Sequence, residues 1–240
     1  MEIDVLNHYV WCYLKSVEQQ LNAYMEDNEA ERLHHIRLDI KKIKAIYSFA
    51  EAIYNESFYT NELNPIFNKA GKMREIQINI KLLHTFPQFP KKLIARLKKK
   101  ENSKVKKFIK NIPLYIKYVK YFREEVTLPK ILPDKKTIKK YFKKERQKAN
   151  NELKNKDREG MHQFRIKIKK MMYVYNILPE ELQKKIELDF AAFNKQQKKI
   201  GKWHDTFSAI QFISNLPFSP KTEEYISILN EKEKRQFNAL

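Results

Sequence analysis

The chain has 240 residues, with 49 Lys and Arg against 29 Asp and Glu, and a formal net charge of +20. It contains only 3 glycines, too few for the many positive-φ turns of a β-rich protein, so we predict an all-α fold. Such a charge repels itself within a folded protein, and it therefore indicates a negatively charged ligand. Codon bias toward Lys, Asn and Ile would explain part of the lysine excess. It does not explain why additional Glu residues do not balance the positive charge.

The N-terminal sequence and the cysteine content indicate the expected compartment. Cys12 is the single cysteine, which excludes an internal disulfide and fits a reducing cytosol. The first residues, MEIDVLNHYVW, carry acids where a signal peptide needs basic residues, and no apolar run approaches the roughly 20 residues of a membrane span. We expect a cytoplasmic protein that does not enter a membrane.

Apolar residues repeat with a period of about 3.6 residues and are interrupted at Asn, Pro and Gly, which predicts helices along the whole chain. In the first half the expected helices are Asp4–Met25, Glu29–Tyr54, Asn61–Thr85 and Lys91–Lys110, with a helical extension at Pro113–Val126. In the second half they are Lys136–Lys154, Arg158–Leu178, Glu180–Leu216 and Thr222–Leu240. This pattern predicts one domain of residues 1–240 made of two four-helix bundles, residues 1–127 and 134–240, joined by a Pro-containing linker at 128–133.

One motif occurs in both halves. Residues 33–49 read LHHIRLDIKKIKAIYSF, and residues 161–177 read MHQFRIKIKKMMYVYNI. Identical residues fall at six aligned positions: His34/His162, Arg37/Arg165, Ile40/Ile168, Lys41/Lys169, Lys42/Lys170 and Tyr47/Tyr175. A second similarity follows each copy, where GKMRE at residues 71–75 matches GKWHD at residues 201–205. The sequence therefore predicts an internal duplication.

The first copy of the motif forms a basic stripe on its helix. At 100° per residue, His34, Arg37, Lys41 and Lys44 fall within roughly 80° of one another, beside the apolar stripe of the same helix. We therefore expect the basic row to border the core, at the wall of a groove or cavity. The row rises roughly 15 Å, which is long enough to face several successive charges of an extended ligand.

The row is unfavourable without a ligand. Arg37 and Lys41, and likewise Lys41 and Lys44, are like-charged helix neighbours, and each pair destabilises by about 0.2–0.5 kcal/mol. No Asp or Glu lies three or four residues from any of them, nor from Arg165 or Lys169. A solvated helix face usually mixes both signs, so the row favours an anion site over a plain surface. A single helix histidine is usually a simple hydrogen-bonding residue, but recurrence at the same register favours ligand contact.

The repeated pattern apolar-His-x-x-Arg-x-x-x-Lys-Lys-x-Lys, followed by Gly-Lys-x-Arg-acid, resembles the CHAD family (conserved histidine α-helical domain) over essentially the whole chain. The resemblance implies two pseudo-symmetric four-helix bundles around a basic cavity, inorganic polyphosphate as the ligand, and association with polyphosphate granules. It also implies the following ligand-binding residues: His34, Arg37, Lys41, Lys42, Lys44, Lys72, Arg74, His162, Arg165, Lys169, Lys170, Lys202 and His204. Met172 replaces the last basic residue of the row and His204 replaces an arginine, so we expect the second half to bind more weakly. Some members carry a triphosphatase domain with an ExExK signature, which this chain lacks, so it resembles a stand-alone member.

Enzyme motifs are absent from the sequence, which has no P-loop and no recognisable nucleophile–base pair. We therefore expect a non-catalytic protein, and since no His, Cys or Glu set has coordinating spacing, we expect neither a metal nor a cofactor. Glu75 and Asp205 recur at matching places, where we expect them to orient neighbouring basic side chains.

Nucleic-acid binding is the alternative function, because the net charge permits it, at least as a weaker and non-specific activity. Against it, no helix-turn-helix, zinc-finger or RNA-recognition motif occurs. Further basic runs at 91–110 and 135–148 are individually typical of a solvated face, and together they would extend a positive field toward the cavity. Two basic rows that converge on one cavity would favour polyphosphate, whereas a broad convex basic surface would favour a duplex.

Overall fold

The structure is a computed structural model, and it describes residues 4–86, 89–125, 127–154, 157–186, 188–217 and 219–240. All regular secondary structure in these residues is helical, which confirms the predicted all-α class. Within the same residues, none of the helices combines the length and the apolar composition that crossing a membrane requires.

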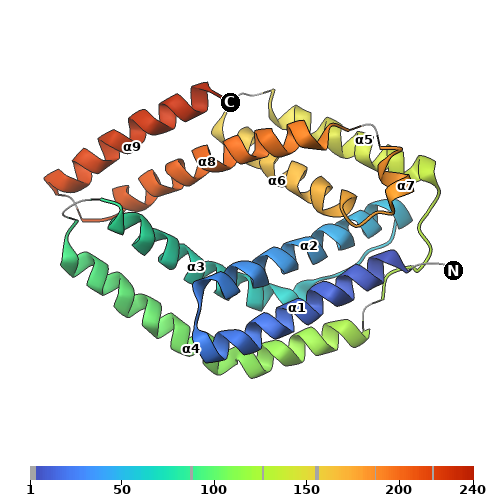
Figure 1. Ribbon diagram of the computed structural model, residues 1–240, viewed down its shortest axis with the longest axis horizontal. Coiled ribbons are helices and arrows are strands. Elements are labelled where there is room, and N and C mark those ends of the chain that lie inside the picture. The colour runs from blue at the N-terminus through green and yellow to red at the C-terminus, as the bar shows by residue number, and fades with distance from the viewer. Residues whose placement is uncertain (1–3, 87–88, 126, 155–156, 187, 218) are drawn as a thin grey trace.

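The first half of the chain folds into four long helices and a short 3-10 helix, η1 (Asn61–Leu63). The long helices are α1 (Val5–Asp27), α2 (Ala30–Tyr54), α3 (Asn64–His84) and α4 (Lys91–Glu125). Each packs on its neighbour in the chain, and α4 also returns to pack on α1 (Figure 1). Asp4 caps α1 by accepting a hydrogen bond from the backbone N–H of Asn7.

The second half contains α5 (Lys135–Glu152), α6 (Arg158–Tyr175), the single turn α7 (Glu180–Gln183), α8 (Phe190–Ser214) and α9 (Pro220–Asn238). Here α5 packs on α6, α6 on α8, and α8 on α9. A side-chain oxygen accepts a backbone N–H bond at the N-terminus of each of the four long helices. The capping residues are Asp134, Asp157, Asp189 and Ser219.

Two predicted helix boundaries were wrong. We expected a break between the helix that ends at Lys110 and the one that begins at Pro113, but α4 continues through Pro113. The helix bends partway along its length, as helices with an internal proline do (Figure 1). The predicted helix Glu180–Leu216 is instead divided into α7 and α8. Asp189 begins α8 as a new helix by accepting the Ala192 N–H at 2.8 Å, which competes with a continuous helix through this segment.

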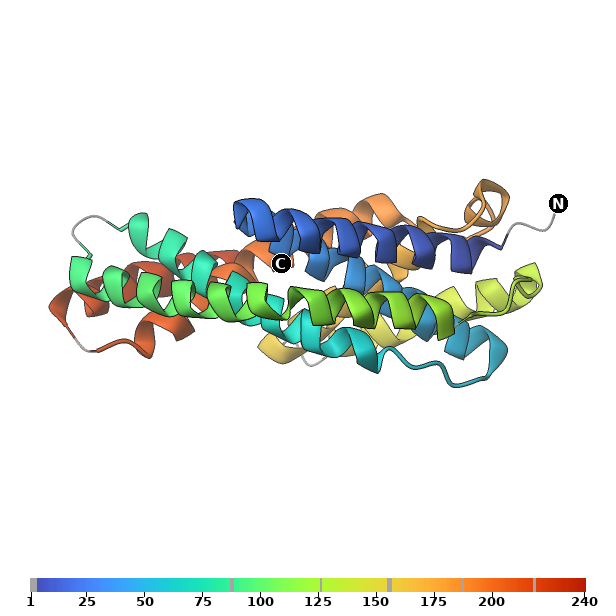
Figure 2. The same cartoon turned by 90° about the horizontal axis from the view of Figure 1, so that it is seen from below.

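Apolar contacts join the two halves at two separate places. In the main core α2 packs on α6, and Phe49 of α2 meets Tyr141 of α5 with ring centroids 4.8 Å apart. A smaller cluster joins α3 and the start of α4 to α8 and α9, where the rings of Phe86 and Tyr225 lie 4.3 Å apart. The result is an elongated ring of helices, seen face-on in Figure 1 and edge-on in Figure 2. Polar residues of α2, α3, α6 and α8 line the openings between these helices.

Candidate anion-binding site

Basic side chains from both copies of the motif converge on one cavity between α2 and α6, with a volume of about 470 Å³. We call it the central cavity. Its basic lining residues are Arg37, Lys41, Lys44, His162, Arg165, Lys169 and Lys170. The sequence pattern predicted that the first basic row borders the core at the wall of a groove or cavity, and it left open whether the two rows meet.

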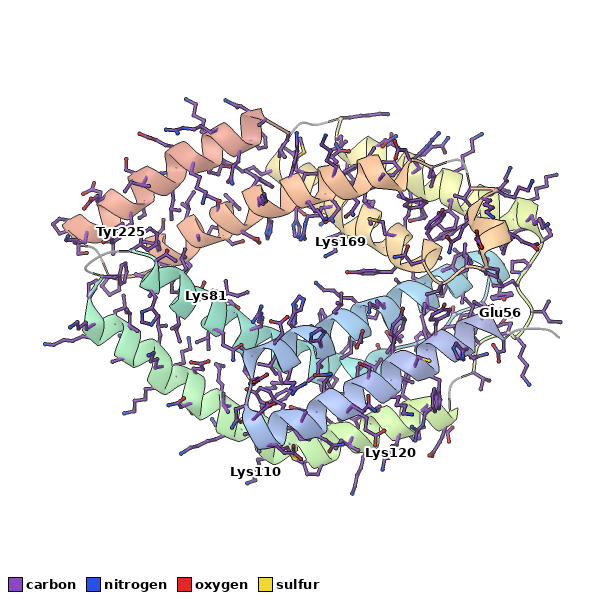
Figure 3. The ribbon with its side chains drawn as sticks, viewed as in Figure 1. Glu56, Lys81, Lys110, Lys120, Lys169 and Tyr225 are labelled. Atoms are coloured by element: carbon purple, nitrogen blue, oxygen red, sulfur yellow. The ribbon has the colours of Figure 1, made fainter. Side chains whose placement is uncertain are left out.

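A larger opening continues from the central cavity between α2, α3 and α8, with a volume of about 1020 Å³. We call it the inner trough. Arg37 and Phe67 line both spaces, so the two are adjacent. The other basic residues of the trough are His34, Lys72, Arg74, Lys81 and His204. Figure 3 shows Lys81 and Lys169 on the inner side of the ring of helices.

Positive charge predominates in the lining of the central cavity. Among the described residues, no carboxylate forms an ion pair with Arg37, Lys41, Lys44, Arg165 or Lys169. Glu75 and Asp205 line the inner trough, and neither forms an ion pair within the described part of the chain. The charge of Asp205 partly offsets the lowering of the pKa of Lys169 and of His204. The site therefore concentrates positive charge that no ion pair within the described residues neutralises.

The Arg37 side chain is held by contacts with α3. Its Nη1 donates a hydrogen bond of 2.7 Å to the carbonyl oxygen of Phe67, and its guanidinium carbon lies 4.2 Å from the centroid of the Phe67 ring. Nζ of Lys44 lies 4.9 Å from the same centroid and 2.5 Å from Oδ1 of Asn64. These contacts fix the direction of both side chains and leave the remaining guanidinium N–H groups for a ligand.

Two buried nitrogen atoms belong to the second motif copy, Nε of Arg165 and Nδ1 of His162. Neither forms a hydrogen bond with any residue that the structure describes. Buried polar groups in native proteins are nearly always satisfied by protein, water or ligand. On the same helix, Nζ of Lys170 donates a hydrogen bond to Oγ of Ser48 on α2 and so links the two motif helices.

The electrostatic environment disfavours positive charge in the central cavity. Burial, followed by the nearby charges of Arg37, Lys169 and Arg165, lowers the pKa of Lys41 to about 8. Burial is also the main cause that lowers the pKa of Lys169, and Arg165 lowers it further. A bound anion would reverse these shifts, because an opposite charge nearby stabilises the protonated amine.

The histidines of the second half form a stacked pair. The rings of His162 on α6 and His204 on α8 have centroids 4.4 Å apart and an interplanar angle of 17°. Burial lowers the pKa of both, and Arg165 lowers each further. Burial likewise lowers the pKa of His34, which lines the inner trough. These shifts hold the three rings toward their neutral form.

Not every predicted site residue lies in the two openings. Lys42 turns toward α1, where its Nζ lies 2.9 Å from Oδ1 of the buried Asp39 and 4.5 Å from the centroid of the Tyr13 ring. Lys202 is exposed and lines neither opening. In the sequence, Lys42 aligns with Lys170 and Lys202 aligns with Lys72, and both of these partners line an opening. A motif position alone does not determine which neighbouring helix a side chain contacts.

Several lining residues were not predicted. Lys81 lies seven residues after Arg74, on the same helix face, and this spacing would have identified it. Tyr173 lies one turn after Lys169, and its ring centroid is 6.0 Å from the Lys169 Nζ. Nothing in the sequence indicates that the Phe67 ring would pack against the Arg37 guanidinium. Among the residues described, we find no group of three or more His, Cys, Asp or Glu side chains placed to hold a metal ion.

Comparisons with known proteins identify the fold. The chain is similar to the crystal structure of the CHAD domain from the plant Ricinus communis, with a TM-score of 0.66 and 13% identity over 97% of this chain and 85% of the other. It is also similar to PptA from Streptomyces chartreusis, with a TM-score of 0.60 and 11% identity over 98% and 95% of the two chains. No curated protein matches the sequence. The family model of the CHAD domain matches residues 9–214, and the chain therefore belongs to the CHAD family.

Proposed function

We propose that this protein binds inorganic polyphosphate, without chemical conversion, in the central cavity and the inner trough. The observation that carries the proposal is the set of cationic side chains from α2 and α6 that line one cavity without a carboxylate partner among the described residues. Holding like charges together in this way is unfavourable for the protein alone and becomes favourable when an anion neutralises them.

The residue types and the shape of the site fit a thin, flexible polyanion. Polyphosphate has repeating charges and no sequence to read, so it requires many donors and little shape discrimination. Arg37 and Arg165 supply planar groups for bidentate contact with phosphate oxygens, and the lysines supply mobile point charges. A recessed cavity between helices admits such a chain more readily than a nucleic-acid duplex, which needs a wide basic surface.

The proposed site draws on a duplicated architecture of two pseudo-symmetric four-helix bundles, residues 1–127 and 134–240. The repeated sequence motif supports this, as does a matching contact in each half, where a helix glycine lies against the motif arginine: Gly71 against Arg37 and Gly201 against Arg165. We assign ligand contacts to the predicted residues that line the two openings. Lys42 and Lys202 are left out of the assignment because they line neither.

We further propose that binding serves association with polyphosphate granules and involves no hydrolysis. The basic groups supply attraction, and the carboxylates of Glu75 and Asp205 are not gathered with others into a metal-binding group within the described residues. Incubation with polyphosphate and divalent metal ions should therefore leave the length distribution of the polymer unchanged, as gel electrophoresis would show.

The central experiment is a titration of the protein with polyphosphate, single-stranded RNA and duplex DNA at one fixed ionic strength. We expect polyphosphate to bind most tightly, and log K to fall linearly with log salt as counterions are released. Equal or tighter binding of either nucleic acid would instead favour the alternative function. An affinity that does not change with salt would contradict an electrostatic site.

A further inference from the structure

A third basic depression lies between α3 and α4, with a volume of about 260 Å³. Its lysines are Lys69, Lys72, Lys104, Lys107 and Lys110, and we call it the lysine cradle. None of the five forms an ion pair with a carboxylate of the described chain. The floor beneath them is built from buried side chains, including Phe108 and Tyr115. The cradle is thus a second site of unneutralised charge on a rigid base.

Lys72 connects the cradle to the proposed binding site, because it lines both the cradle and the inner trough. Basic residues therefore follow one another from the central cavity, through Arg37 and the trough, over Lys72, and onto α4. Figure 3 shows Lys110 at the outer edge of the molecule, whereas Lys169 lies on the inner side of the ring. The basic track thus leads from the interior to the exterior.

The opposite side of the central cavity is less basic than the cradle. Ser48, Ile166 and Lys170 line both this cavity and a neighbouring depression of about 430 Å³ that also contains Glu51 and Glu145. Glu145 pairs with Lys148 at 2.6 Å, which neutralises one of the cations present there. Two carboxylates stand against three lysines in this depression, whereas the cradle has five lysines and no carboxylate in its lining, so the charge favours an exit over Lys72.

We infer that the lysine cradle is an outer subsite for the same polyanion, which leaves the inner trough over Lys72 and continues along α4. The inference rests on the proposed function and adds a length preference to it. A chain that fits within the central cavity gains nothing from the cradle, whereas a longer chain contacts both. The protein should therefore discriminate between long and short polyphosphate.

The test compares Lys104→Glu/Lys107→Glu/Lys110→Glu with the wild type, with tripolyphosphate and long-chain polyphosphate as probes at fixed ionic strength. We expect the variant to lose about tenfold or more in affinity for the long chain, with a shallower salt dependence because fewer counterions are released. Its affinity for tripolyphosphate should stay within about twofold of the wild type, because local charge changes are screened beyond about 10 Å.

The matched control is Lys98→Glu/Lys99→Glu/Lys100→Glu, which places the same charge change on exposed residues of the same helix. Its smaller effect on long-chain affinity would support the cradle, and an equal effect would overturn it in favour of diffuse net charge. If the cradle variant binds long chains as the wild type does, the cradle is wrong while the central site stands. If the wild type binds neither probe, the proposed function fails and the cradle fails with it.

Discussion

A Cβ atom added to Gly71 of α3 would lie 2.1 Å from Nη1 of Arg37 on α2, closer than real Cβ contacts allow. The second half repeats the relationship, since a Cβ at Gly201 of α8 would lie 3.1 Å from Nε of Arg165 on α6. Glycine inside a helix destabilises it by about 1 kcal/mol relative to alanine. The two glycines are explained by the close approach of the motif arginines.

Gly71→Ala should separate ligand binding from stability. The clashing atom is the mobile end of a long side chain, and alanine favours the helix, so we expect the free energy of unfolding to change by less than about 1 kcal/mol. Arg37 would have to leave the Phe67 carbonyl, so we expect polyphosphate affinity to fall by about tenfold, or about 1.4 kcal/mol. Calorimetric titration and urea denaturation measure the two quantities.

Gly201→Ala serves as the comparison for this prediction. Its added Cβ would need a displacement of only a few tenths of an ångström at Arg165, so the loss of affinity should be smaller than for Gly71→Ala. An unchanged affinity in Gly71→Ala would show that the position of Arg37 does not matter for binding.

Arg37→Glu/Lys41→Glu should weaken polyphosphate binding by orders of magnitude. Hydrogen bonds to charged groups contribute about 1.5–3 kcal/mol each, and the substitution replaces two such donors with repulsive carboxylates. Because neither residue belongs to the buried apolar core, the variant should remain helical. Titration calorimetry and circular dichroism melting provide the measurements.

The control for the charge reversal is Lys99→Glu/Lys100→Glu, two exposed residues of α4. It should lose far less affinity than the reversal in the central cavity. Equal losses would mean that the ligand is held by net charge alone. If the cavity variant unfolds and the control does not, Arg37 and Lys41 are structural residues.

Lys41 predicts a pH dependence above neutrality. Its pKa is about 8 in the folded protein, against an ordinary value of 10.5, so the free protein loses this charge as pH rises through about 8. We therefore expect polyphosphate affinity to decrease between about pH 7 and pH 9. Over the window from 8 to 10.5 the unfolded chain binds the proton and the folded chain does not, so this group makes the protein more stable as pH rises.

Lys41→Arg tests the assignment, because arginine stays protonated throughout this range. The affinity of the variant should vary less with pH than that of the wild type, as titrations at several pH values would show. If both proteins show the same decline, another group is responsible for it.

The stacked pair of His162 and His204 predicts that acidification below neutrality lowers the stability of the free protein and raises its affinity for polyphosphate. Both folded-state pKa values lie under the ordinary 6.5, so below about pH 6.5 the unfolded chain takes up protons first and the free protein loses stability. A bound polyanion stabilises the protonated rings, so its affinity should increase over the same range. In the variant His162→Gln/His204→Gln we expect both pH effects to be reduced. Thermal melting and titration at about pH 7.5 and about pH 5.5, one value on each side of the histidine transition, measure them. Unreduced effects would assign them to other groups, such as His34.

The sequence alone determined the helical class, the repeated basic row and its position beside the apolar stripe. These are local properties, since a helical period and a like-charged neighbour can be read within one or two turns. The same local reading failed at Pro113 and at Glu180–Leu216. At Pro113, α4 continues with buried residues on both sides of the proline. In the other predicted helix, the Asp189 cap begins a new helix, and this cap is an equally local signal.

Only the tertiary structure decided which charges share a site. Lys42 and Lys170 occupy the same motif position, yet Lys42 meets the buried Asp39 near α1, while Lys170 lines the central cavity and bonds to Ser48. The lysine cradle joins residues of α3 and α4 that share no motif. Electrostatic interaction depends on distance in space, and the packing of the helices, not the spacing of residues along the chain, sets that distance.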